Sequence, residues 1–130
     1  MRYRRRSVLI ANGTREIAQE CRQRLEQAGF SVFIATDGDQ ACILAARQRF
    51  DLIVTNLELP IVSGAEFCRH VREDLQLSDV PIAVCAAAGR ERVAGDLAVD
   101  FSIARIFGQP VDTDSLVEFA KEATGDLVTA

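Results

Sequence analysis

The sequence has very little of several residue types and patterns on which common protein chemistry depends. Its 130 residues include one lysine, one histidine and no tryptophan. No apolar run approaches the roughly 20 residues of a membrane span, and no signal-peptide core follows the basic start. The cysteines are far apart and form no Cys-x-x-Cys pair, which argues against a zinc site. We therefore expect a cytoplasmic protein whose thiols are free and buried, at Cys21, Cys42, Cys68 and Cys85.

The composition is that of one globular domain. Hydrophobic residues make up 48% of the chain and charged residues 26%, and this length suffices to bury an ordinary core. The net charge of −4 disfavours a nucleic-acid surface. Four arginines lie within residues 1–6, which we expect to form a basic tail. The predicted domain covers residues 7–124, and residues 125–130 form a C-terminal tail.

Apolar runs typical of buried strands alternate along the chain with patterns typical of helices. Strands are predicted at Ser7–Ala11, Val32–Ala35, Leu52 onwards, Val80–Cys85 and about Ala104–Phe107. Five helices follow them, the fourth weak, and the last capped by Asp112, Thr113 or Asp114. This alternation predicts an α/β fold: a three-layer α/β/α, (βα)5 doubly wound parallel five-stranded sheet, flavodoxin-like, with strand order 2-1-3-4-5.

The stretch from Asp51 to Gly64, DLIVTNLELPIVSG, is central to the functional interpretation. An apolar run leads to Asn56, where the strand should end, and Pro60 then prevents the strand from continuing. Ser63 and Glu66 form a capping-box pattern that starts a helix. Because sites in parallel sheets lie at the carboxyl ends of the strands, the predicted strand order brings together the strand ends at Asn12-Gly13, Asn56, Ala86 and Gln109.

Several stretches together resemble the receiver domains of two-component response regulators. The resemblance covers about residues 7 to 122 and rests on VLIANGTRE, ATDGDQA, DLIVTNLELP with SG after it, VPIAVCAAA and QP. It implies a role in a phosphorelay. In that family an aspartate accepts a phosphoryl group with the help of magnesium, an acidic pair, a hydroxyl side chain and a lysine.

Carried over residue by residue, the resemblance places different chemistry at each of these positions. Asn56 stands at the phosphoacceptor position, and Asn12 and Gly13 stand at the two acidic positions. Ala86 stands at the hydroxyl position and Gln109 at the lysine position. The family usually has an aromatic switch residue three positions before that lysine, and here it is Ile106. An amide nitrogen does not accept a phosphoryl group at neutral pH, and magnesium normally needs carboxylate ligands. We therefore expect a degenerate receiver, or pseudo-receiver, that is not an enzyme and binds neither Mg²⁺ nor another cofactor. Glu58 is interpreted as a solvated loop acid.

The resemblance also implies a protein partner. We expect a signalling protein to bind the face formed by the fourth helix, fifth strand and fifth helix. A homodimer is also possible on this interpretation. We expect neither nucleic acid nor a membrane as a partner. Two alternatives stay open. One is a receiver regulated by phosphorylation of Ser63 or Thr14. The other is a small flavodoxin-like nucleotide binder, against which the short turn after the first strand and the lone, water-facing His70 argue.

Overall fold

A computed structural model describes residues 5–125. Its sheet contains five parallel strands: β1 (Ser7–Ala11), β2 (Ser31–Ala35), β3 (Leu52–Asn56), β4 (Ile82–Ala86) and β5 (Arg105–Gly108). The strands lie in the order β2-β1-β3-β4-β5. The predicted fold class and strand order are therefore confirmed.

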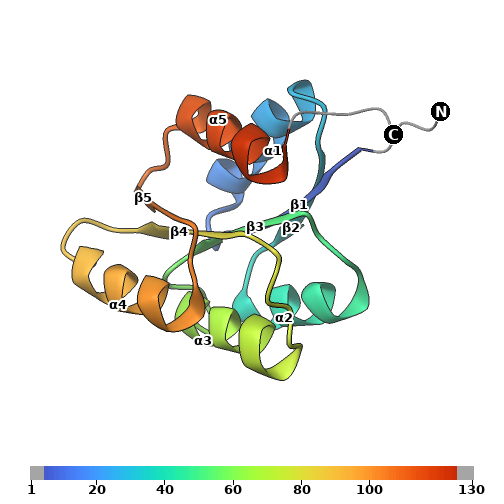
Figure 1. Cartoon of the computed structure of the whole chain (residues 1–130). Helices are drawn as coiled ribbons and strands as arrows, with labels where there is room; N and C mark the ends of the chain where they lie inside the picture. Colours follow the sequence, from blue (N-terminus) through green and yellow to red (C-terminus); the bar gives the residue numbers. More distant parts are fainter. Residues whose placement is uncertain (1–4, 126–130) are drawn as a thin grey trace.

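Five helical segments connect and follow the strands and cover both faces of the sheet (Figure 1). Helices α1 and α5 lie on one face, and α2, α3 and α4 lie on the other. Their bounds are α1 (Arg15–Gln27), α2 (Gly38–Arg47), α3 (Gly64–Arg69), α4 (Glu91–Phe101) and α5 (Thr113–Thr124). Helix α3 continues into a π-helical turn, η1 (His70–Asp74). No helix within residues 5–125 is long and apolar enough to cross a membrane.

The core consists of two apolar layers, one on each side of the sheet. Strand β1 shows why its sequence is apolar without interruption: Val8 and Ile10 pack in the layer under α1 and α5, while Leu9 and Ala11 pack in the opposite layer. All four are at most 2% exposed. Successive strand side chains point to opposite faces, so a strand covered on both faces is apolar at nearly every position.

Several element boundaries differ from the sequence prediction by one or two residues. The fourth strand was predicted from Val80 but begins at Ile82, because the backbone carbonyl of Val80 accepts a hydrogen bond from Arg72 at 2.8 Å instead of joining the sheet. The weak fourth helix is a full helix despite Gly95. The cap of the last helix is Asp112, whose carboxylate accepts the N–H of Asp114 at 3.1 Å.

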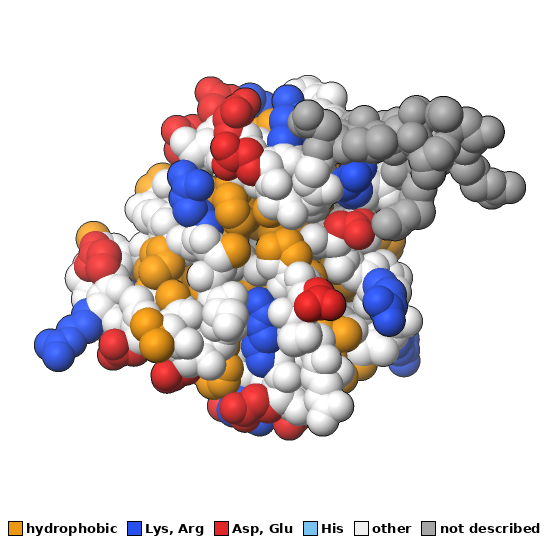
Figure 2. All heavy atoms as spheres, viewed as in Figure 1, with side chains coloured by type: hydrophobic (Ala, Val, Ile, Leu, Met, Phe, Trp, Pro, Cys, Tyr) orange, Lys and Arg blue, Asp and Glu red, His pale blue; other side chains and the backbone are white. Residues whose placement is uncertain are grey.

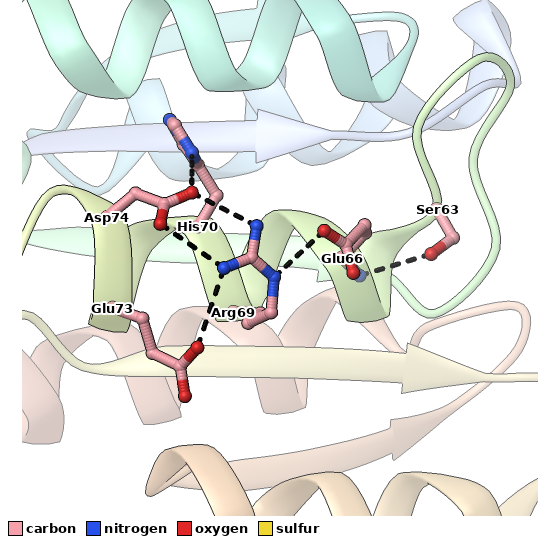
Figure 3. Close-up of polar contacts among 6 residues, drawn as sticks. All are labelled: Ser63, Glu66, Arg69, His70, Glu73 and Asp74. Carbon is pink, nitrogen blue, oxygen red and sulfur yellow. Dashed lines mark hydrogen bonds and ion pairs between the residues drawn. The ribbon is translucent and has the colours of Figure 1, made fainter.

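The π-helical turn was not predicted, and it belongs to a network of charged side chains on α3 and η1 (Figure 3). The guanidinium of Arg69 contacts Glu66 at 2.8 Å, Asp74 at 3.0 Å and Glu73 at 3.5 Å. Asp74 also contacts Nδ1 of His70 at 2.9 Å. The His70 side chain is 28% exposed, so it is partly open to water.

Candidate functional site

A polar hollow of about 240 Å³ lies at the carboxyl ends of the strands. The loops after β1, β3, β4 and β5 all contribute to it, as expected for a parallel sheet of this topology. The residues that line it are Gly13, Thr14, Asn56, Leu57, Glu58, Ala87, Arg90 and Gln109.

Asn12 lies next to the hollow, and its side-chain oxygen is already used. The Asn12 side chain is buried, with 6% of the residue exposed, and its Oδ1 accepts the backbone N–H of Thr14 at 2.8 Å. The backbone N–H of Asn12 donates to the Ala35 carbonyl at 3.0 Å. Side chains of this kind commonly bond to the backbone two residues ahead in turns. Asn12 therefore shapes the turn into α1.

Asn56 ends β3 and lines the hollow. The loop that follows returns against it, and Ser63 starts α3 by accepting the N–H of Glu66 at 3.1 Å. Gly64 then packs against the β3 backbone so closely that a Cβ atom there would lie 1.8 Å from the Asn56 carbonyl oxygen. Only glycine permits this approach, so Gly64 fixes where Asn56 stands.

The β3–α3 loop contains an unusual backbone turn at its tip. Ile61 has a φ of +72°, and the N–H of Val62 donates to the Pro60 carbonyl at 2.8 Å across it. This hydrogen bond and positive φ describe a γ-turn of the rare, strained kind. The Ile61 side chain is 79% exposed. The loop is held from the other side by Gly38, whose N–H donates to Pro60 at 3.0 Å.

Gln109 ties the end of β4 to the loop after β5. Its Nε2 donates to the Cys85 backbone carbonyl at 3.0 Å, and the same carbonyl accepts the N–H of Leu57 at 2.8 Å. Burial, with a smaller contribution from Cys21, raises the pKa of the Cys85 thiol to about 12. The thiol is therefore protonated at neutral pH and is a poor nucleophile.

The charged residues that line the hollow are Glu58 and Arg90, and they bind each other. Nη2 of Arg90 lies 2.9 Å from Oε2 of Glu58, with 45% and 67% of the two side chains exposed. Glu58 is exposed as predicted, but it is paired, not simply solvated. Sequence reasoning did not find Arg90, because no local pattern links it to Glu58.

The residues at the five family positions are distributed unevenly around the hollow. Gly13, Asn56 and Gln109 line it, whereas Asn12 is buried beside it. Ala86 was expected to line the hollow, but it is only 3% exposed, and the next residue, Ala87, lines the hollow instead. The lining also includes Thr14, which directly follows the predicted Asn12-Gly13 turn. Ile106 lies outside the lining, on β5, and is 38% exposed.

The sequence profile of the response regulator receiver domain matches residues 8–121, so the chain belongs to this family. The response regulator MprA of Mycobacterium leprae is 36% identical over 90 residues, which are 68% of this chain and 39% of that protein. A probable transcriptional regulator, ycf29 of Pyropia yezoensis, is 28% identical over 103 residues, 78% of this chain and 45% of that protein. The chain thus spans about half the length, or less, of these curated relatives.

Solved receiver structures share the fold. The chemotaxis response regulator CheY4 of Vibrio cholerae superposes with a TM-score of 0.82 at 23% identity, covering 92% of this chain and 99% of that one. The receiver domain of a Pseudomonas aeruginosa sensor histidine kinase has a TM-score of 0.79 at 22% identity, covering 95% and 100%. That domain holds a magnesium ion in its active-site cleft. At these identities the likeness concerns the fold alone.

Proposed function

We propose that this receiver domain acts in two-component signalling as a phosphorylation-independent interaction module, a pseudo-receiver formed by residues 7–124. The observation that carries the proposal is Asn56, which ends β3 and lines the hollow where the family resemblance places the phosphoacceptor aspartate. An amide has no carboxylate oxygen with which to form an acyl phosphate. The domain then transmits information through binding alone.

The donor set around the hollow does not suit magnesium. Mg²⁺ requires octahedral oxygen ligands and usually one or two carboxylates. Here Oδ1 of Asn12 accepts the Thr14 N–H, and the carboxylate of Glu58 is bound to Arg90. Within residues 5–125, no three acidic, histidine or cysteine side chains are grouped closely enough to hold a metal ion. We therefore assign no step to magnesium.

A phosphoryl group entering the hollow would also lack a free cation. Phosphoryl transfer depends on positive charge placed where negative charge develops. Gln109 is neutral and donates to Cys85, while Arg90 is paired with Glu58. The single lysine of the chain, Lys121, lies on α5. These three observations support the same proposal as Asn56.

The partner is proposed to bind the face formed by α4, β5 and α5. Figure 2 shows hydrophobic side chains where β5 lies between α5 and α4, and acidic side chains over α5. Val99 on α4 is 84% exposed, and Ile106 on β5 is 38% exposed. The guanidinium of Arg105 lies over the rings of Phe107 and Phe119, 5.2 and 5.6 Å from their centroids. Exposed apolar side chains with a charged rim suit a protein partner.

A thermal melt with and without millimolar magnesium tests the proposal. We expect the midpoint of the wild type to be unchanged by magnesium. The reference is a variant carrying Asn12→Asp, Gly13→Asp, Asn56→Asp, Ala86→Thr and Gln109→Lys, whose midpoint should rise. A Cβ atom on Gly13 would lie 3.1 Å from Cδ of Pro60, so this variant also requires the Pro60 ring to shift. A magnesium-dependent rise in the wild type, reversed by chelator, would contradict the proposal.

A further inference from the structure

Helix α4 is held at its N-terminal end by a contact across the hollow. Arg90 is the N-cap residue of α4 and makes no side-chain capping bond to the helix. Its guanidinium instead binds Glu58 on the β3–α3 loop at 2.9 Å. The ion pair therefore links the start of α4 to the loop that follows Asn56.

The end of β4, which precedes α4 in the chain, accepts hydrogen bonds from two neighbouring segments. The Cys85 carbonyl accepts the N–H of Leu57 at 2.8 Å and Nε2 of Gln109 at 3.0 Å. The first bond comes from the end of β3 and the second from the loop after β5. Three strand ends around the hollow are thus connected without any ligand.

The C-terminal end of α4 is held by Arg72 of η1. Its Nε donates to the Phe101 carbonyl at 2.8 Å and its Nη2 to the Ser102 carbonyl at 3.1 Å. Its Nη1 donates to the carbonyls of Leu77 and Val80, both at 2.8 Å. A cation at a helix C-terminus is favourable because the last carbonyls carry partial negative charge. Helix α4 is therefore fixed at both ends.

We propose that Glu58, Arg90 and Gln109 form a built-in latch, which holds the β4–α4 segment in one position without a phosphoryl group or a metal. The face of α4, β5 and α5 is then presented to a partner in a single conformation. This inference rests on the proposed function. It adds that the domain binds its partner constitutively, without switching between two conformations. Two side-chain contacts hold this segment: Glu58 with Arg90, and Gln109 with the Cys85 carbonyl.

Amide hydrogen exchange and NMR relaxation dispersion test the latch. We expect residues 87–94 of the wild type to show no millisecond exchange. Glu58→Gln should speed amide exchange there by about two- to five-fold, the range that an exposed ion pair supports. Glu58→Gln with Arg90→Gln should add little to this effect. The charge swap, Glu58→Arg with Arg90→Glu, should restore slow exchange.

Matched controls separate the latch from general effects on stability. Glu73→Gln also removes one exposed ion pair, with Arg69 at 3.5 Å, and should leave residues 87–94 unchanged. Gln109→Ala should speed exchange at both 85–90 and 105–110. At about 1 M salt the screening length falls to about 3 Å. Amide exchange at residues 87–94 of the wild type should then become nearly as fast as in Glu58→Gln.

Two outcomes would overturn the latch: equal exchange at residues 87–94 in the wild type and Glu58→Gln, or millisecond motion there already in the wild type. Each spectrum is also recorded with beryllofluoride and magnesium. A response of the wild type to that addition counts against the proposed function. A lack of difference between wild type and Glu58→Gln counts against the latch alone.

Discussion

Gly64 packs directly on the backbone of Asn56: a Cβ atom on Gly64 would lie 1.8 Å from the Asn56 carbonyl oxygen and 2.7 Å from that of Leu57. The chain thus folds back on the end of β3 as soon as the loop closes. The position of Asn56 in the hollow depends on a glycine eight residues later in the sequence.

Replacing Gly64 by alanine should therefore be strongly destabilising. The new methyl group would collide with backbone atoms, which cannot rotate away as a side chain can. We expect Gly64→Ala to lower the free energy of unfolding by at least about 2 kcal/mol, measured by urea denaturation. Loss of folding altogether would also agree with this account, whereas a change below about 0.5 kcal/mol would contradict the observed packing.

Gly95 offers the matched control, because it lies within α4 and a Cβ atom there would meet nothing within 4 Å. Glycine in a helix interior costs about 0.5–1 kcal/mol relative to alanine. Gly95→Ala should therefore stabilise the protein by about that amount. A loss of stability in the same urea titration would show that the space beside Gly95 is occupied.

Replacing Ile61 by glycine should stabilise the protein. Its φ of +72° is unfavourable for a β-branched residue, and its side chain is 79% exposed, so little buried surface is lost on removal. Relief of strain worth about 1–3 kcal/mol exceeds the entropy that glycine adds to the unfolded chain, about 0.5–1 kcal/mol. We expect Ile61→Gly to raise the free energy of unfolding, while Ile61→Val leaves it nearly unchanged. A less stable Ile61→Gly variant would show that the turn is not strained.

Restoring one acid should not restore the metal site. Asn56→Asp returns a single carboxylate, but Oδ1 of Asn12 still accepts the Thr14 N–H and Glu58 is still bound to Arg90. We expect no heat of magnesium binding at millimolar concentration in calorimetry. If Asn56→Asp alone binds magnesium in that range, the account of the ligands is wrong.

Acid pH should remove a stabilising contribution of Asp74. Hydrogen bonds from Arg69, and secondly from His70, lower the pKa of Asp74 below its ordinary value of 3.8. The contribution is therefore complete above about pH 5, and it declines below about pH 4 as the pH falls through the lowered pKa. The difference in unfolding free energy between wild type and Asp74→Asn should shrink as the pH falls through that window. Asp100→Asn, a change at an exposed acid on α4, is the control. A difference that grows on acidification would contradict the assignment.

The fold was largely predictable because its signals are local. The run Ser7–Ala11 is a strand with the predicted bounds, because burial on both faces favours apolar residues at every position from Val8 onward. Asp112 was one of three predicted caps and is the cap observed. The fourth strand was predicted to begin two residues too early, because the bond from Arg72 to the Val80 carbonyl leaves no mark on the apolar pattern.

The hollow was less predictable than the sheet. Gly13, Asn56 and Gln109 could be assigned to it because each follows a strand end, and strand ends meet at one edge of a parallel sheet. The pairing of Glu58 with Arg90 could not be predicted, because side-chain contacts between loops depend on packing at long range. The γ-turn at Ile61 also could not, because local preference disfavours positive φ at isoleucine.

The most direct test of the central claim is exposure of the wild type to acetyl phosphate with magnesium, followed by intact mass measurement. A receiver with an intact site should gain the mass of one phosphoryl group in an acid-stable, hydroxylamine-sensitive form, and its amide spectrum should shift around the hollow. For this protein we predict no added mass and no shift at residues 12, 56 and 109. Added mass mapped to a carboxylate in the hollow, with shifts at those residues, would contradict the account.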